Sequence, residues 1–208
     1  MHSILSSRTL AGLAVAVSSI IGLTSCASEL TRTGSSPAFV IIDSIVGASG
    51  AEPEEFGSPL ASDVQTGGGT FNDLGRATLR LGLRNPGSAT NPTAPSTLNT
   101  ITLSRYRVEF RRSDGRNTQG VDVPYAFDGA ATVTIPAQGS TEVIFEVVRN
   151  QAKLEAPLRN LRGLGGALII STIAEITFFG RDQVGNEVVA TGTLSVNFAD
   201  FADPEGGQ

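Results

Sequence analysis

Residues 78–84 read Thr-Leu-Arg-Leu-Gly-Leu-Arg, an unbroken alternation between apolar side chains and polar or small ones. A period of two places the three leucines on one face of a β-strand and Arg80 and Arg84 on the other face. The stretch therefore predicts a strand with one face against a core and one face toward solvent.

The same period dominates the chain from residue 38 to residue 198, and it predicts six further strands. They are expected at residues 39–46, 101–112, 132–135, 142–148, 167–179 and 188–198. The alternation changes phase near Ser104-Arg105, as a β-bulge requires. Residues 167–179 are apolar on both faces, which is typical of a central strand.

Turn residues separate these segments. Asp114-Gly115 predicts a tight hairpin turn, and residues 136–140 and 182–186 predict turns between neighbouring strands. Residues 150–155 are the one expected helical turn. Residues 47–75 and 85–97 are expected to be long loops, the places where function or disorder concentrates.

Together these patterns predict an all-β fold, a single antiparallel sandwich of about seven or eight strands. The predicted organisation is a cleaved signal peptide at 1–25, a lipidated cysteine and flexible tether at 26–37, the sandwich at 38–199 and a tail at 200–208. The length of 208 residues suits one domain, since one core of that size buries about 70% of its unfolded surface.

The N-terminus has the pattern of an export signal: Arg8 is followed by uncharged, mostly apolar residues up to Leu23. About a dozen apolar residues fall short of the roughly 20 that cross a bilayer as a helix. The segment ends in Leu23-Thr24-Ser25-Cys26, which resembles the lipobox of bacterial lipoprotein precursors. The resemblance implies cleavage before Cys26 and acylation of that residue. The alternative is an ordinary secretory signal with an incidental buried thiol.

After such cleavage the chain has no histidine and no thiol other than Cys26. That composition excludes Ser-His-Asp and Cys-His catalysis, as well as zinc, haem and iron-sulfur sites that need His or Cys ligands. Two acidic groupings, at residues 182–187 and 200–205, do not have the spacing of a calcium loop. The sequence predicts no catalytic residue, no cofactor and no metal.

Two short motifs are similar to immunoglobulin-like and desiccation-related sandwich domains: Arg84-Asn85-Pro86 after a strand, and residues 135–140 leading into Phe145. Residues 105–203 more broadly resemble uncharacterised bacterial envelope proteins, through Asp114-Gly115-Arg116-Asn117, residues 121–125 and Phe179-Gly180-Arg181-Asp182. The resemblance implies an immunoglobulin-like fold and an envelope location, and no activity.

Charge is uneven along the chain. Residues 76–116 contain eight arginines and two acidic residues, a balance of +6, whereas the rest of the chain after residue 25 holds six basic and 18 acidic residues. The candidate anion-binding or partner-binding face comprises Arg80, Arg84, Arg105, Arg107 and Arg111. If their two strands pair, one sheet has an arginine ladder on its outer face. Alternatively, Glu109, Glu142 and Glu146 on neighbouring strands neutralise these arginines.

The predicted function is that of a non-catalytic, membrane-anchored envelope lipoprotein acting as a binding or structural module. Its partners would be the membrane, through the lipid anchor, and a protein or an anionic glycan or lipid; the acidic total argues against nucleic acid. Ala27 after the cysteine favours the outer membrane, by similarity to the enterobacterial sorting pattern. The alternatives are an accessory subunit of an export or assembly complex and, less favoured, a glycan-active enzyme.

Overall fold

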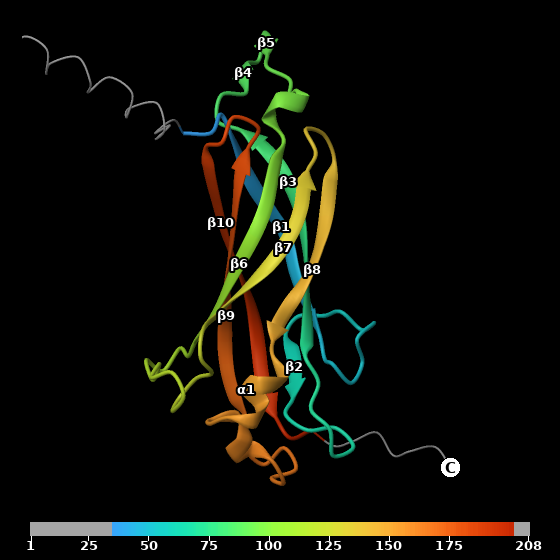
Figure 1. Ribbon diagram of the computed structural model, residues 1–208, viewed down its shortest axis with the longest axis vertical. Helices are drawn as coiled ribbons and strands as arrows, with labels where there is room; N and C mark the ends of the chain where they lie inside the picture. The colour runs from blue at the N-terminus through green and yellow to red at the C-terminus, as the bar shows by residue number, and fades with distance from the viewer. Residues whose placement is uncertain (1–34, 202–208) are drawn as a thin grey trace, which may run out of the picture. The chain divides into compact units, whose positions relative to one another are not determined.

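The computed structural model describes residues 35–201 (Figure 1). The lipobox and Cys26 lie outside these residues, as do most of the predicted tether and of the predicted tail. The first strand begins at Ala38 and the last ends at Ala199.

Two sheets make up most of the described part, so the prediction of an all-β fold with antiparallel sheets is confirmed. Every neighbouring pair is antiparallel except β2 and β10, which are parallel. The three-stranded sheet has the order β1 (Ala38–Ala48), β3 (Asp73–Leu83), β8 (Ser140–Val148). The five-stranded sheet has the order β2 (Leu60–Asp63), β10 (Glu187–Ala199), β9 (Ile170–Asp182), β6 (Ile101–Arg111), β7 (Phe127–Ile135).

The remaining elements are short and lie near the ends of the sheets. One end has the hairpin of β4 (Gly87–Ser88) and β5 (Asn91–Pro92) and the 3-10 turn η1 (Thr97–Asn99). The opposite end has α1 (Asn150–Leu154) and the 3-10 turn η2 (Leu158–Leu161). Helix α1 falls within the helical turn predicted at residues 150–155.

The alternation that predicted the strands matches their burial. In β3, Leu79 and Leu81 are buried while Arg80 between them is exposed. In β6, the register shifts between Leu103 and Arg105, so the bulge predicted from the change of phase is confirmed. The bulge lets the buried positions of β6 remain on the core side along its whole length.

The turns predicted at residues 114–115 and 136–140 both form, but the first does not close a tight hairpin. Asp114-Gly115 does form a turn, in which the Gly115 N–H donates to the Arg112 carbonyl, but β6 and β7 are joined by the whole segment 112–126 and not by a tight hairpin. The turn at residues 136–140 connects β7 to β8, which belong to different sheets. Only packing between distant strands, which no local turn residue encodes, decides which sheet the second strand joins.

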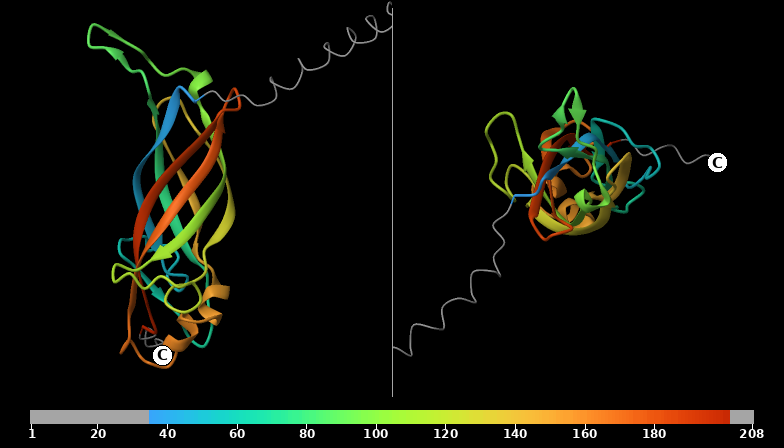
Figure 2. Two further views of the ribbon diagram at one scale, coloured as in Figure 1. Left: turned by 90° about the vertical axis from the view of Figure 1, so that its left-hand side faces the viewer. Right: turned by 90° about the horizontal axis from the view of Figure 1, so that it is seen from above.

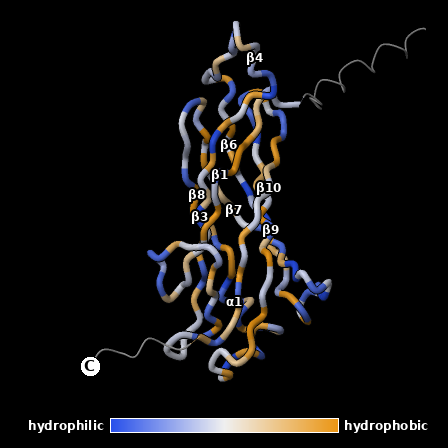
Figure 3. The backbone as a smooth tube through the Cα atoms, turned by 180° about the vertical axis from the view of Figure 1, so that it is seen from behind, coloured by the Kyte–Doolittle hydropathy of each residue, from blue (hydrophilic) through white to orange (hydrophobic). Residues whose placement is uncertain are grey.

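The two sheets curl toward each other around one core. Strand β1 lies beside β10, and β7 lies beside β8, so a view along the long axis shows the strands surrounding the interior (Figure 2). Hydrophobic residues alternate with hydrophilic ones along the strands, and the hydrophilic residues gather at the loops (Figure 3).

Tyr106 is the centre of an aromatic cluster in this core. Its ring centroid lies 5.1 Å from that of Phe145, 6.2 Å from Phe127 and 6.4 Å from Phe178. Its hydroxyl accepts the backbone N–H of Glu146 at 3.2 Å, and burial raises the pKa of Tyr106. The contact joins β6 of one sheet to β8 of the other.

Candidate functional site

The five predicted arginines lie on two different sheets. Arg80 is in β3 and Arg84 follows it, in the three-stranded sheet, whereas the three others are on β6 in the five-stranded sheet. The condition for one arginine ladder is therefore not met, because β3 pairs with β1 and β8 while β6 pairs with β7 and β9.

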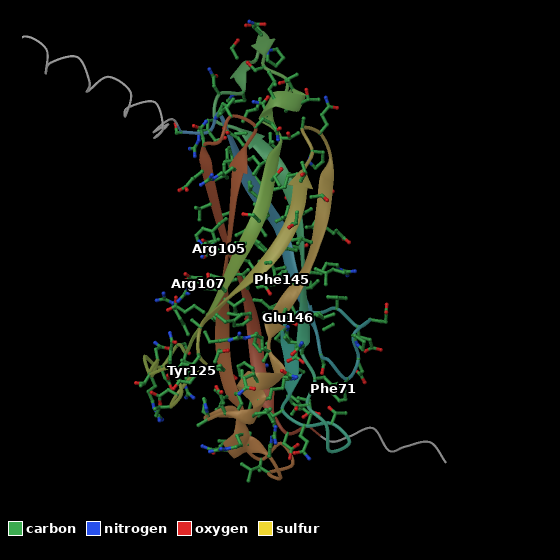
Figure 4. All side chains as sticks on the ribbon, in the orientation of Figure 1. Phe71, Arg105, Arg107, Tyr125, Phe145 and Glu146 are labelled. Atoms are coloured by element: carbon green, nitrogen blue, oxygen red, sulfur yellow. The ribbon has the colours of Figure 1, made fainter. Side chains whose placement is uncertain are left out.

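The arginines of β6 are matched by carboxylates on the same outer face. Asp128 of β7 accepts from both Arg105 Nη1 at 2.7 Å and Arg107 Nη1 at 2.8 Å. Figure 4 shows these two arginines together on the outer side of β6. Arg111 lies 3.5 Å from a Glu109 oxygen, and its Nε lies 3.8 Å from a carboxylate oxygen of β9.

The arginines of β3 also have partners. Arg80 Nε donates to Asp43 Oδ1 at 2.7 Å, and Arg84 Nε donates to the Ser36 carbonyl at 2.9 Å. Of the three glutamates expected to neutralise the arginines, Glu109 does so. Glu142 lies opposite Thr78 on β3, and Glu146 accepts from Asn72 Nδ2 at 2.7 Å.

A surface depression of about 330 Å³ lies at the β6 bulge, on the outer face of the five-stranded sheet. Arg105 forms one wall, its guanidinium carbon 3.9 Å above the Phe179 ring centroid. Arg181 of β9 and Glu187 of β10 form a second wall, with Arg181 Nη2 3.4 Å from Glu187 Oε1. The remaining lining residues are Ser104, Gly180, Val188 and Val189.

The chemistry of this depression suits a small anionic group next to an apolar surface. Each guanidinium offers planar donors for a carboxylate or phosphate, and the Phe179 ring holds Arg105 in place from below. The side chains of Arg105 and Arg181 are 51% and 68% exposed, so both remain open to a ligand.

Sequence reasoning missed a second cluster, at the end of the fold near α1. Lys153 Nζ lies 2.7 Å from Asp73 Oδ1, and both side chains are buried. The Ser62 hydroxyl donates to Asp73 Oδ2 at 2.5 Å, and the Gly50 N–H donates to Oδ1 at 2.8 Å. Burial raises the pKa of Asp73, while Lys153 and the two hydrogen bonds oppose that rise.

One signal in the sequence pointed to this cluster. Lys153 is the only lysine in a chain with fourteen arginines, and it stands on the one predicted helical turn. Asp73 gave no such signal, because an aspartate before a strand is ordinarily a turn residue.

Among residues 35–201, no three His, Cys, Asp or Glu side chains are placed to hold a metal ion; Asp203 and Glu205 of the second acidic grouping lie outside that range. Asp182 instead accepts the N–H of Val184 at 3.0 Å and the N–H and side-chain amide of Asn186 at 2.9 and 2.8 Å. Asp200 accepts the Gly163 N–H at 2.6 Å.

Within the same described range, no helix has the length and apolar character needed to cross a bilayer. Comparison of the chain with protein-family models, with curated proteins and with solved structures gives no match in any of the three.

Proposed function

We propose that this chain is a lipid-anchored protein of the bacterial cell envelope whose β domain is a non-catalytic binding or structural module. The observation that carries the proposal is the lone Cys26 directly after the apolar segment that ends in Leu23-Thr24-Ser25. Two or three acyl chains on Cys26 would hold the protein on a membrane, where a single chain is marginal. By the Ala27 criterion that membrane is the outer one.

We assign the domain to the immunoglobulin-like sandwiches as part of the same proposal. Two facing sheets around one core, with mainly antiparallel neighbours, support the assignment. Such domains commonly present binding surfaces on loops and sheet faces while the core stays rigid.

The depression at the β6 bulge is the proposed recognition surface. An anionic group of a glycan, a lipid or a protein partner would replace Glu187 on Arg181 and share Arg105 with Asp128. The ion pairs Arg105–Asp128 and Arg181–Glu187 are exposed, and exposed pairs contribute only about 0–1 kcal/mol to stability. A ligand carboxylate or phosphate can therefore replace the protein carboxylate at little cost in free energy.

The anchor is tested by fractionating cells that express the wild type or the Cys26→Ser variant. We expect the wild type in the membrane fraction, with acylated Cys26 as the first residue by mass spectrometry. The variant should leave that fraction. Equal retention of the variant on membranes would refute the anchor.

The recognition surface is tested with a photo-crosslinking amino acid at position 189, in the depression, and at position 144, on β8 of the other sheet. Val189 and Ile144 are 57% and 59% exposed, so the two probes are equally accessible. Adducts obtained from position 189 only, and lost on Arg105→Ala, support recognition there. Equal or absent adducts at both positions exclude the depression.

The identity of the adduct separates the module from its alternatives. A glycan or lipid adduct favours the binding module, and one recurrent protein in stoichiometric amount favours the accessory subunit. A glycan-active enzyme requires two carboxylates in one depression. Glu52 and Glu55 line a second depression, of about 160 Å³. Glycan cleavage by the wild type that is lost in Glu52→Gln and in Glu55→Gln would favour the enzyme.

A further inference from the structure

Lys153 forms a buried pair with Asp73. If charge pairing were the only role of this residue, arginine would suit the position better. Fourteen of the chain's fifteen Lys and Arg residues are arginine, and the one lysine is 1% exposed beside an aspartate that is 0% exposed. Arginine holds its charge when buried and binds carboxylates with a planar fork. Lysine alone can lose its proton on burial and then act as a nucleophile.

Both side chains of the pair are buried, and burial raises the free energy of an ionic pair. Removing two ions from water carries a large desolvation penalty. An ammonium has three N–H donors, yet among the described residues Asp73 is the one acceptor within hydrogen-bonding distance of Lys153 Nζ. The pKa of Asp73 is raised by burial, despite the opposing effect of Lys153, which again favours the protonated carboxyl group.

Hydrogen-bond donors contact both oxygens of the Asp73 carboxyl group, an arrangement that suits attack on its carbon by a nucleophile. The buried Ser62 hydroxyl donates to Oδ2 at 2.5 Å, and the Gly50 N–H donates to Oδ1 at 2.8 Å. The Gly50 N–H would stabilise the negative charge that develops on Oδ1 when an amine adds to Cγ, and the Ser62 hydroxyl would assist the departure of Oδ2. The amine is in place, with Nζ 2.7 Å from Oδ1.

We propose that Lys153 and Asp73 join in an intramolecular amide bond. The Nζ lone pair attacks Cγ of the protonated carboxyl group, and the Nζ–Cγ bond forms. A proton passes from Nζ to Oδ2 within the adduct, the Cγ–Oδ2 bond breaks while the Ser62 hydroxyl hydrogen-bonds the departing Oδ2, and one water molecule leaves. Oδ1 remains as the amide carbonyl and accepts the Gly50 N–H. The condensation needs no oxidant, no reductant and no further reactant.

The amide would tie the beginning of β3 to α1, which follows β8. Such a cross-link stabilises a fold by constraining the unfolded chain, as a disulfide does. With Cys26 as its only cysteine, the chain has no means of forming an internal disulfide. An amide bond would supply the same constraint and would survive reducing conditions.

The test uses the single lysine as its own reporter. The full chain is unfolded in guanidinium chloride, treated with an amine-reactive reagent and digested with trypsin. We expect wild-type Lys153 to stay unlabelled, trypsin not to cut after it, and its peptide to be joined to the peptide that contains Asp73. The intact chain should be lighter than its sequence by one water molecule.

The matched control is Asp73→Ala, which removes the acyl group. Its Lys153 should be fully labelled, and its mass should show no loss of water. Because labelling is done on unfolded protein, this control does not depend on whether the variant folds. If wild-type Lys153 is labelled as fully as in the control and the mass of the wild type shows no deficit, the pair is ionic and the proposal is wrong.

Discussion

Three glycines in the strands lie opposite aromatic residues, and each ring covers its glycine. The pairs are Gly75 with Phe145, Gly82 with Phe39, and Gly129 with Tyr106. A Cβ at any of the three would overlap atoms of the paired ring. Glycine ordinarily weakens a strand, and the covering ring compensates by packing against the bare backbone.

Gly129→Ala should destabilise the domain by about 1–3 kcal/mol, because the new methyl group displaces the Tyr106 ring at the centre of the core. Urea denaturation measures the change. The matched control is Gly57→Ala, where no atom lies within 4 Å of the added Cβ, and it should change stability by less than about 0.5 kcal/mol. Equal effects of the two substitutions would refute the packing role of Gly129.

Asp182 should make stability depend on pH in the acid range. Burial acts to raise its pKa, but hydrogen bonds from Asn186, Ser36 and Val184 outweigh burial, and the pKa lies below the ordinary value of 3.8. A carboxylate favoured by the fold contributes stability above the unfolded pKa. That contribution is lost as the pH falls below about 4 and through the lower folded value.

We therefore expect Asp182→Asn to lose less stability than the wild type when the pH falls from about 6 to about 3. Urea midpoints across this range measure the difference. The control is the range from pH about 6 to 8, in which the carboxylate stays ionised and the two proteins should change in parallel. Parallel behaviour below pH about 4 as well would contradict the assignment of this group.

At the scale of strands, a period of two is enough to predict an element but not its partner. The alternation of residues 78–84 and the change of phase at Ser104-Arg105 are local properties, and both predictions are confirmed. The assignment of β7 and β8 to different sheets depends on contacts between distant side chains. The arginine ladder failed for that reason: it required β3 and β6 to pair.

The same limit applied to the candidate site. The sequence predicted that Arg105 and Arg107 point outward, and it could not show that Asp128 accepts from both. Phe179 entered the depression only because β9 pairs with β6. The buried pair of Lys153 and Asp73 was missed because its partners come from segments far apart in the chain.

Arg105 and Arg107 offer a matched comparison on one strand. They share Asp128 and have similar exposure, but only Arg105 stacks on Phe179, at 3.9 Å. Arg107→Ala should lower stability by about 0–1 kcal/mol, as for exposed ion pairs. Arg105→Ala should lower it by about 0.5–1 kcal/mol more, because the cation–π contact is lost as well.

Chemical denaturation of both variants measures this difference, and a Phe179→Leu background provides the control. Without the aromatic ring, the two arginine substitutions should have equal effects. A difference that persists in that background would assign the extra stability to a contact other than the ring.

At the scale of the whole molecule, hydrogen bonds and rings connect two sheets that share no ladder. Tyr106 of β6 makes the most direct connection, because its hydroxyl accepts the Glu146 N–H of β8 and its ring packs against Phe145 of the same strand. Figure 4 shows Phe145 and Glu146 as neighbours on β8. The hydroxyl fixes one sheet against the other at a defined position, whereas apolar packing alone is not directional.

Tyr106→Phe keeps the ring and removes only this hydrogen bond, which leaves the Glu146 N–H without its acceptor. The expected loss is about 0.5–1.5 kcal/mol in the free energy of unfolding, the net contribution of one intramolecular hydrogen bond, since the donor is partly buried. Tyr125→Phe is the control, because Tyr125 is 53% exposed, so its effect should stay below about 0.5 kcal/mol. Hydrogen exchange gives a second readout: the amide of Glu146 should exchange faster in Tyr106→Phe, and amides in the middle of the β9–β10 ladder should not. Equal stability of the two variants, together with unchanged protection of Glu146, would mean that the two sheets are held together by apolar packing alone.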